Sequence, residues 1–421
     1  MTELAVAPAV GYYGDDVTGS VDVLLQVARQ GMRGCLFIGT PAPAALRRAA
    51  AAYEVIGIAG IARSLDPDAL DAEVRPALSA LRDLAPRVVQ YKACSTADSS
   101  PTVGSLGRVI EIGREIFGER PVPLLFAQPD FGRYTLFGHH FAAEGGTVHR
   151  LDRQPTMSQH PSTPMDESDL ARHLSRQTTL PIGGIPLTRY STATDLARTI
   201  DDSSGAALVL DALDDANLAL IGGALDDLGA ARHPLFAIGS GGLSRALALG
   251  RPASALADER SADGPVLAIS GSRSPQTRRQ LAAARDAGWA VSPLSSDAAT
   301  YAEVVDLLRS GRSVALSSED ATAFTDHPDV LAGIAEAATT VIGEALRSGA
   351  TRRLIVCGGD TSSRVVRALG IASLSIAANP SANVVVLRAR SDDPAVDGTE
   401  LLLKGGQVGD DDLFEAVRRG R

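Results

Sequence analysis

The chain has 421 residues, too many for one ordinary hydrophobic core, and this length predicts two domains. Asp and Glu total 50 against 40 for Lys and Arg, giving a net charge of −10 that no basic run offsets, which argues against a nucleic-acid partner. The three cysteines are widely spaced, and we find neither a signal sequence nor an apolar run long enough to span a bilayer, so we expect a cytoplasmic protein with no membrane partner.

Apolar runs alternate with amphipathic stretches over the first 250 residues. We expect strands at Val10–Gly14, Gly34–Ile38, Val55–Ile61, Val88–Cys94, Leu124–Ala127, Ala207–Leu210 and Leu235–Ile238, and helices at Val21–Gln30, Ala69–Leu84 and Val103–Phe117. Strands that alternate with helices are typical of a parallel, doubly wound sheet. The Pro-, His- and Ser-rich stretch Gln154–Pro164 interrupts this pattern, and we expect a long surface loop there.

The polar stretch Gly250–Gly264 reads as a linker, after which a second series of strands begins. Its expected strands are Val266–Ser272, Ser313–Leu316, Leu354–Cys357 and Val384–Leu387. We therefore predict an α/β protein of two domains, residues 1–250 and 264–421, each built on a mostly parallel sheet flanked by helices.

Two adjacent carboxylates, Asp15 and Asp16, follow the first predicted strand. Ligands of open parallel sheets bind outside the carboxyl ends of the strands, so the pair is well placed for general-base catalysis, metal binding or hydroxyl binding. The alternative is a helix cap, which explains one aspartate more readily than two.

A second polar cluster follows the strand that ends near Lys92. Lys92 is followed by Ser95, Asp98 and Ser99, a set that suits a polar anionic ligand, although an ordinary side-chain-capped turn is the alternative. Another strand ends just before Arg63 and Ser64, where the guanidinium could hold a carboxylate through two hydrogen bonds.

Three glycine- and serine-rich turns mark the second half of the chain. One joins an apolar run to a helix through Gly358, Gly359, Asp360 and Thr361; the others contain Ser270 with Ser272, and Gly405 with Gly406. A glycine turn before a helix leaves backbone N–H groups free to bind phosphate, although many such turns bind nothing.

Other motifs are missing or incomplete. Neither a GxxxxGK[ST] loop nor the protein-kinase signatures occur. The turn at Gly239 lacks the complete dinucleotide pattern, so a dehydrogenase is a weak alternative. The histidines, among them His139, His140 and His160, lack metal-ligand spacing, and we interpret them as surface or packing residues.

Taken in order, these motifs resemble the four-carbon acid sugar kinase family over nearly the whole chain. The similar blocks are Asp15-Asp16-Val17-Thr18-Gly19-Ser20 with Asp22, Lys92 through Pro101, Gly132-Arg133 with Thr135 and Gly138, His160-Pro161 with Thr163-Pro164-Met165, Ser270-Gly271-Ser272 with Thr277 and Gln280, Gly358 through Ser362, and Lys404 through Gly409. The chain departs from the family pattern at Val17, Ser20, Ala97 and Gln407-Val408.

The resemblance implies an N-terminal acid-sugar domain, a C-terminal ATP domain, and transfer of the γ-phosphoryl group to a substrate hydroxyl with ATP and Mg²⁺. It implies Asp15 or Asp16 as the aspartate that positions or deprotonates the nucleophile, Lys92 and Arg63 on the substrate carboxylate, and Arg133 among the substrate-binding residues. Threonate, erythronate, 3-oxo-tetronate and 3-oxo-isoapionate are the expected substrate types, and the small Ala97 could make room for a branch. The metal ligands stay unknown, a homodimer stays open, and a non-catalytic sugar-acid or nucleotide sensor is the alternative function.

Overall fold

A computed structural model describes residues 7–160, 162–231, 234–250, 259–319, 329–381 and 384–420. The chain divides into two compact units, Met1–Ala255 and Leu256–Arg421, which we call the N-unit and the C-unit. The division falls within the expected linker, of which residues 251–258 lie outside the described residues.

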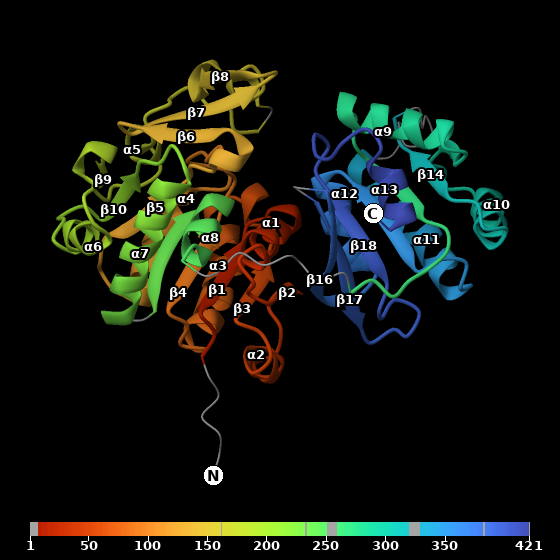
Figure 1. Ribbon diagram of the computed structural model, residues 1–421, viewed down its shortest axis with the longest axis horizontal. Helices are drawn as coiled ribbons and strands as arrows, with labels where there is room; N and C mark the ends of the chain where they lie inside the picture. The colour runs from red at the N-terminus through yellow and green to blue at the C-terminus, as the bar shows by residue number, and fades with distance from the viewer. Residues whose placement is uncertain are drawn as a thin grey trace, which may run out of the picture. The chain divides into compact units, whose positions relative to one another are not determined.

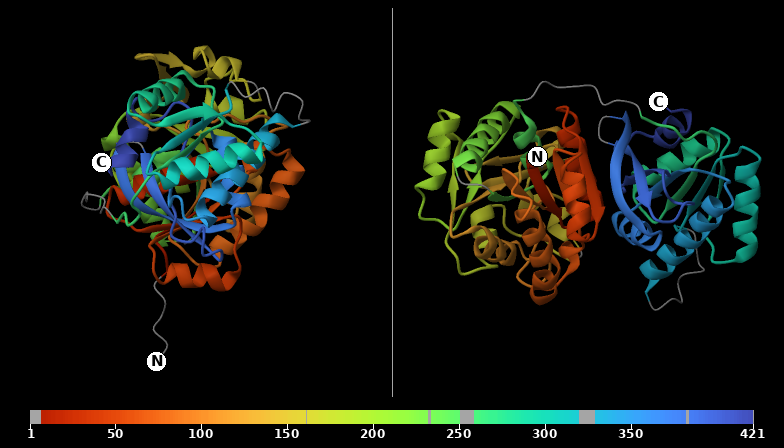
Figure 2. Two further views of the ribbon diagram at one scale, coloured as in Figure 1. Left: turned by 90° about the vertical axis from the view of Figure 1, so that its right-hand side faces the viewer. Right: turned by 90° about the horizontal axis from the view of Figure 1, so that it is seen from below.

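The N-unit is built on eight parallel strands in the order β2-β3-β1-β4-β11-β5-β10-β9 (Figure 1). The strands are β1 (Val10–Gly14), β2 (Gly34–Ile38), β3 (Val55–Ala59), β4 (Val88–Lys92), β5 (Val122–Leu125), β9 (Ile182–Ile185), β10 (Ala207–Leu210) and β11 (Leu235–Gly239). The helices are α1 (Val17–Ala28), α2 (Pro43–Ala50), α3 (Pro67–Arg82), α4 (Leu106–Phe117), α5 (Leu170–Leu174), α6 (Ala193–Asp201), α7 (Asp215–Ala231) and α8 (Gly241–Ala248). Helices cover both faces of this sheet (Figure 2). The apolar residues of the buried strands form two core clusters with these helices.

A small antiparallel sheet lies at one end of the N-unit (Figure 1). Its strands are β6 (Arg133–Leu136), β7 (His139–Glu144) and β8 (Thr147–Arg150). A β-bridge joins Thr135 to Ala212, just beyond the carboxyl end of β10, so this sheet borders the carboxyl-end edge of the large sheet. This sheet was not predicted from the sequence, because its strands are short and face solvent in part.

The C-unit sheet has the order β13-β14-β12-β15-β18-β17-β16, in which β17 is antiparallel to both of its neighbours. Its strands are β12 (Leu267–Ser270), β13 (Ala290–Pro293), β14 (Val314–Ser317), β15 (Arg353–Cys357), β16 (Ile371–Ser381), β17 (Val384–Ser391) and β18 (Glu400–Lys404). Its helices are α9 (Pro275–Asp286), α10 (Ala298–Arg309), α11 (Val330–Arg347), α12 (Gly359–Ala368) and α13 (Leu413–Arg419). The prediction of two α/β units with mostly parallel sheets is confirmed.

Two predictions of local structure were wrong. Helix α1 begins at Val17 and not at Val21, because the side chain of Asp16 caps it by accepting a hydrogen bond from the Gly19 N–H. The expected surface loop 154–164 contains buried Met157, which belongs to a small apolar cluster with Met165, so the stretch is partly core; residue 161 lies outside the described part.

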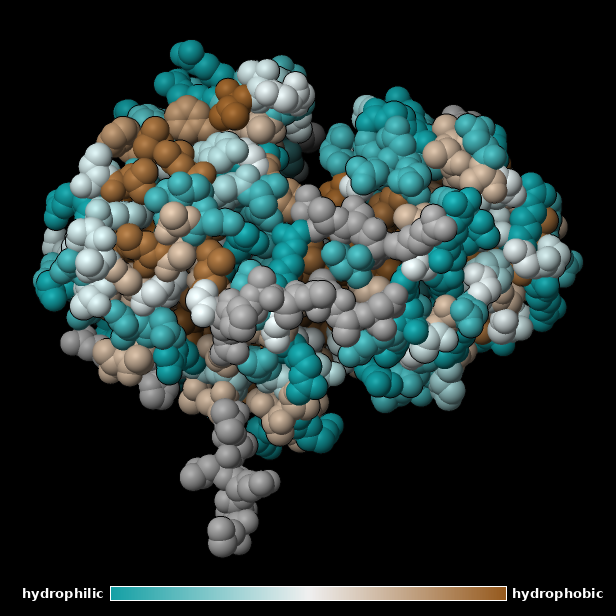
Figure 3. Space-filling view, in the orientation of Figure 1, coloured by the Kyte–Doolittle hydropathy of each residue, from teal (hydrophilic) through white to brown (hydrophobic). Residues whose placement is uncertain are grey.

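The face shown in Figure 3 is mostly hydrophilic, with apolar residues in small separate groups. In the parts of the chain that the structure describes, no helix is long and apolar enough to cross a membrane.

Candidate active site

The carboxyl ends of β3, β1 and β4 carry the predicted catalytic and substrate residues. Gly14, the last residue of β1, pairs with Ala59 on one side and with Lys92 on the other. Helix α1, which follows β1, packs against α8, whereas α3, which follows β3, packs against α4 on the opposite face. The chain therefore leaves neighbouring strands toward opposite faces, and parallel sheets form their ligand crevices at such points.

Asp15, Asp16 and Arg63 form one ion cluster at this edge. Arg63 Nη2 donates to Asp15 Oδ1 at 2.7 Å, its Nε to Asp15 Oδ2 at 3.2 Å, and its Nη1 to Asp16 Oδ2 at 2.8 Å. Because the guanidinium already binds both carboxylates, Arg63 could hold a substrate carboxylate only by exchanging one of these bonds, and that role stays a prediction.

Lys92 approaches the same cluster from β4. A Cβ atom added at Gly19 would lie 2.5 Å from Asp16 Oδ1 and 3.1 Å from Lys92 Nζ, so the Lys92 ammonium and the Asp16 carboxylate converge on this position. Lys92 is buried, and its Nζ donates to the Ala93 carbonyl at 2.9 Å. The ammonium thus stands at the aspartate cluster with hydrogen-bonding capacity left for an anionic ligand.

The two aspartates differ in their electrostatics. Burial raises the pKa of Asp15 above its ordinary value, and although Arg63 opposes this effect, the neighbouring Asp16 charge adds to it. Burial acts in the same direction on Asp16, but Arg63, Lys92, Thr18 and the Gly19 N–H stabilise its carboxylate, so its pKa is lowered. Asp15 is therefore the better proton acceptor of the two, and Asp16 the more firmly fixed charge.

The loop after β4 is held by hydrogen bonds within the loop and by a contact with His173. Thr96 Oγ1 donates to Asp98 Oδ1 at 2.8 Å, and Ser99 Oγ donates to the Ala97 carbonyl at 2.9 Å. Ser99 Oγ also lies 3.1 Å from Nε2 of the buried His173. Ser99 thus holds the loop in shape, whereas half-buried Ser95 and Asp98 lie closer to solvent.

Ser64 and Arg133, the other predicted substrate residues, have different surroundings. Ser64 is exposed and donates through Oγ to the Ile61 carbonyl at 3.1 Å, which closes the turn that carries Arg63. Arg133 donates through Nη1 to backbone carbonyls, and its buried Nε has no hydrogen-bond partner among the described residues. Burial lowers the pKa of Arg133. A half-buried guanidinium with a free donor is suited to an anionic ligand.

The phosphate-loop candidates lie together at the carboxyl ends of β12, β15 and β18. Ser270, Cys357 and Lys404 form one row across these adjacent parallel strands. Gly358 has φ +109°, a conformation that favours glycine, and its N–H donates to the Lys404 carbonyl at 2.9 Å. The predicted loop residues that the row positions are Ser270, Ser272, Gly358, Gly359, Asp360, Thr361, Gly405 and Gly406.

Helix α12 starts at Gly359, and no side chain caps its N-terminus. Exposed Asp360 and buried Thr361 lie in its first turn, where the backbone N–H groups have no intrahelical acceptor. An anion is the ligand that such a helix start favours.

Lys404 was predicted only as part of the family block Lys404 through Gly409 and not as an individual site residue. Its side chain is buried, and Nζ donates to Thr277 Oγ1 at 3.1 Å and to the Gly406 carbonyl at 3.4 Å. It has no ion pair within the described part of the chain, and burial lowers its pKa. Thr277 Oγ1 also lies 3.4 Å from Ser272 Oγ, so the Lys404 ammonium lies close to two hydroxyl groups. A buried ammonium without a counter-ion is a ready site for phosphate.

The rarity of lysine in the sequence could have drawn attention to Lys404. Of the 40 Lys and Arg residues, only Lys92 and Lys404 are lysines. Each lysine is buried at the carboxyl end of a strand, one in each unit. The Lys ammonium is a compact charge on a flexible chain, whereas the Arg guanidinium is planar and larger. We infer that these two buried positions suit the compact charge.

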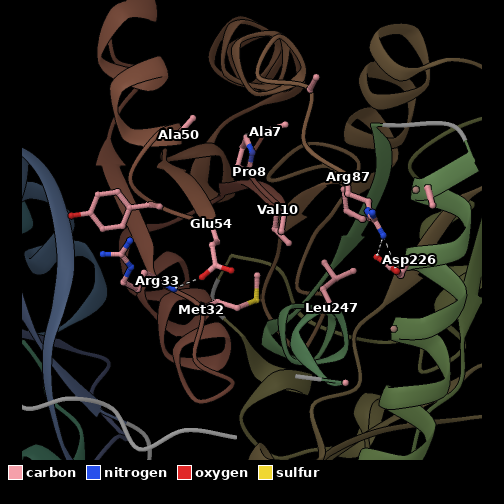
Figure 4. A pocket seen from close by; sticks show the side chains of 18 of the residues that line it. Ala7, Pro8, Val10, Met32, Arg33, Ala50, Glu54, Arg87, Asp226 and Leu247 are labelled. Atoms are coloured by element: carbon pink, nitrogen blue, oxygen red, sulfur yellow. Dashed lines mark hydrogen bonds and ion pairs between the residues drawn. The ribbon is translucent and has the colours of Figure 1, made fainter. Parts of the chain in front are cut away.

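A separate pocket of about 1030 Å³ lies at the opposite edge of the N-unit sheet (Figure 4). It includes Val10 and Val88, the first residues of β1 and β4. Its charged groups are satisfied internally, as in the ion pair between Arg87 and Asp226 at 2.8 Å. Since it lies away from the strand carboxyl ends, we do not assign the reaction to it.

Side chains and backbone of the protein occupy the space next to the glycines that follow Gly239. Ser240 caps α8 by accepting from the Gly242 N–H at 3.0 Å. A side chain at Gly241 would collide with Asp22 and with Gln128, so these glycines serve close packing. This arrangement favours the plain tight turn over a dinucleotide loop.

Family models match both units. A model described as a sugar-binding N-terminal domain matches residues 10–247, and one described as a nucleotide-binding C-terminal domain matches residues 267–414. A 3-oxo-isoapionate kinase from Paraburkholderia graminis is 36% identical over 98% of this chain and 94% of its own length. The chain belongs to the four-carbon acid sugar kinase family. The predicted family and enzyme class are thereby confirmed.

Other relatives agree with this membership. A 3-oxo-tetronate kinase from Pseudomonas fluorescens is 31% identical over 97% of this chain and 96% of its own length. Solved structures from Salmonella typhimurium LT2 (TM-score 0.78, 23% identity, 98% of this chain and 99% of that chain) and Haemophilus influenzae (TM-score 0.73, 20% identity, 97% and 99%) are similar. At these identities the two structures show the fold alone.

Proposed function

We propose that this family member phosphorylates a hydroxyl of a four-carbon or branched sugar acid of the 3-oxo-isoapionate or 3-oxo-tetronate type, with ATP as the donor. The observation that carries the proposal is the pair of complementary sites: paired carboxylates with Lys92 in the N-unit, and an uncapped helix start beside a buried lysine in the C-unit. The relatives named above supply the substrate class.

Asp15 is the proposed proton acceptor. As the substrate oxygen forms its bond to the γ-phosphorus and the bond to the ADP oxygen breaks, the hydroxyl proton passes to the Asp15 carboxylate. The raised pKa of Asp15 suits this role, whereas Asp16, fixed by Arg63 and by its helix cap, orients the cluster.

The substrate carboxylate is proposed to bind Lys92 and Arg133. Both have donors left for a ligand, whereas all three bonding nitrogens of Arg63 are engaged by the aspartates. Ser95 and Asp98 stay candidates for the substrate hydroxyls, since they line the same loop.

The ATP phosphates are proposed to bind at the start of α12 and at Lys404, with the Ser272 hydroxyl nearby. Mg²⁺, when bound with ATP, would neutralise phosphate charge. The donor set fits a metal that takes most of its ligands from phosphates and water, with exposed Asp360 as the proposed protein carboxylate.

The test is ADP release by purified protein with ATP and Mg²⁺ against 3-oxo-isoapionate, 3-oxo-tetronate, threonate and erythronate. We expect turnover on at least one acid and its loss in Asp15→Asn. ATP binding without turnover on any of these acids would contradict the kinase assignment and favour the sensor.

The homodimer and the cytoplasmic location stay predictions, the latter supported by the three free thiols.

A further inference from the structure

A buried hydrogen-bond chain links the small sheet to the substrate loop. Thr135 Oγ1 on β6 lies 2.9 Å from His140 Nδ1 on β7, and His140 Nε2 lies 2.7 Å from the Ser95 carbonyl oxygen. Thr135 and His140 are both fully buried. The chain therefore connects two segments far apart in sequence, and one end of it lies in the loop that begins at Lys92.

The donors and acceptors along this chain have one consistent assignment. A carbonyl oxygen can only accept, so His140 Nε2 carries the hydrogen, and Nδ1 of the neutral ring accepts from the Thr135 hydroxyl. Thr135 is itself held on both sides, because its N–H donates to the Ala212 carbonyl and its carbonyl accepts from the Ala212 N–H. Burial and the nearby Arg133 charge favour the neutral ring by lowering the pKa of His140.

The loop that receives this bond needs outside support. Ala97 has φ +51°, a left-handed conformation that is unfavourable for any residue with a Cβ atom. Such a conformation persists only where the surroundings fix it. The two histidine contacts flank it, with His140 at the Ser95 carbonyl and His173 at the Ser99 hydroxyl.

We propose that Thr135 and His140 are positioning residues that hold the Ser95 carbonyl, and through it the loop after Lys92, in the conformation that binds the sugar acid. This inference rests on the proposed function, since it assigns the loop to the sugar-acid site. Neither side chain needs to touch substrate: Thr135 fixes the imidazole tautomer, and the imidazole fixes the loop.

The first test compares Thr135→Val, which keeps the shape and removes the hydroxyl, with Thr135→Ser, which restores it. With the hydroxyl gone, the ring is free to adopt the other tautomer, in which Nε2 cannot donate to Ser95. We expect Thr135→Val to raise KM for the sugar acid about two- to tenfold, as for the loss of one buried hydrogen bond, with KM for ATP unchanged. Thr135→Ser should return KM to near the wild-type value.

His140→Leu should have the same effect as Thr135→Val. His149→Gln is the matched control, because His149 lies on β8 of the same sheet and has no contact with the loop among the described hydrogen bonds. Amide hydrogen exchange of residues 93–100 in the substrate-free protein should accelerate in Thr135→Val and His140→Leu, and stay at the wild-type rate in His149→Gln.

Unchanged exchange of the loop in both variants would overturn the proposal. So would a lower thermal stability accompanied by unchanged KM, since that is the result of a purely structural role. Failure of the kinase assignment is distinguishable: wild-type protein would then turn over no sugar acid, while the exchange experiment would still report whether Thr135 and His140 hold the loop.

Discussion

Replacing Lys404 by Met separates its role in binding from its effect on stability. Met keeps most of the length of the side chain and removes the charge. A hydrogen bond to a charged group contributes about 1.5–3 kcal/mol, so ATP should bind about 10- to 150-fold more weakly. The nucleotide-free protein should not lose stability, because its buried ammonium has no ion pair in the described part of the chain.

The lowered pKa of Lys404 determines how the stability of the protein changes with pH. The pKa of Lys404 in the folded protein is lowered from 10.5, so in the interval below that value the unfolded chain binds more protons than the folded one. The wild-type protein therefore gains stability as the pH rises through this interval. The stability advantage of Lys404→Met should be greatest at neutral pH and should shrink as the pH approaches 10.5.

The assay is titration calorimetry with ATP, together with thermal unfolding with and without ATP. Arg367→Met is the control, since it removes an exposed positive charge from α12 of the same unit. Wild-type ATP affinity in Lys404→Met would refute the phosphate assignment. Weaker ATP binding in Arg367→Met of the same size would show that the effect is one of net charge alone.

Three further predictions concern the N-unit. Asp15→Asn should lower kcat by about 10²–10⁴-fold in the ADP-release assay, as for loss of a general base, with ATP affinity retained; wild-type kcat would exclude Asp15 as the base. Arg133→Gln should raise KM for the sugar acid and leave KM for ATP unchanged, because the Arg133 guanidinium, whose Nε has no partner among the described residues, is proposed to bind the substrate carboxylate; equal changes in both constants would contradict this role. Burial lowers the pKa of His140 from 6.5 to about 4, so the unfolded chain gains its proton first as the pH falls, and chemical denaturation should show roughly 3 kcal/mol of stability lost across that interval. His140→Gln should lack this part of the pH dependence, and an unchanged profile would contradict it.

The sequence located the polar residues that end or follow parallel strands, whose functional roles stay predictions. Apolar runs fix such strands, and ligand groups follow their carboxyl ends, so Asp15, Lys92 and Gly358 could be placed before the fold was known. The start of α1 was misplaced because its first turn contains Thr18 and Gly19, residues of low helix propensity, and the cap formed by Asp16 overrides that propensity.

Two features, the surroundings of Lys404 and the contacts of His140, could not be predicted from the neighbouring sequence. Lys404 ends an apolar run, and it lacks a counter-ion among the described residues because of the groups that β12, β15 and β18 bring together, which the local sequence does not reveal. The role that we propose for His140 depends on its contacts with Thr135, on the neighbouring strand, and with Ser95, which is distant in sequence. Neither carries a spacing signal, so our interpretation of His140 as a mere packing residue missed its two hydrogen bonds.

The central claim is phosphoryl transfer from ATP to a sugar acid. The most direct measurement is mass spectrometry of the products formed by wild-type protein from γ-labelled ATP, Mg²⁺ and 3-oxo-isoapionate or 3-oxo-tetronate. We predict a phosphorylated sugar acid that carries the label in equal amount to the ADP formed. Label found only in inorganic phosphate, or no ADP with either acid, would contradict the account.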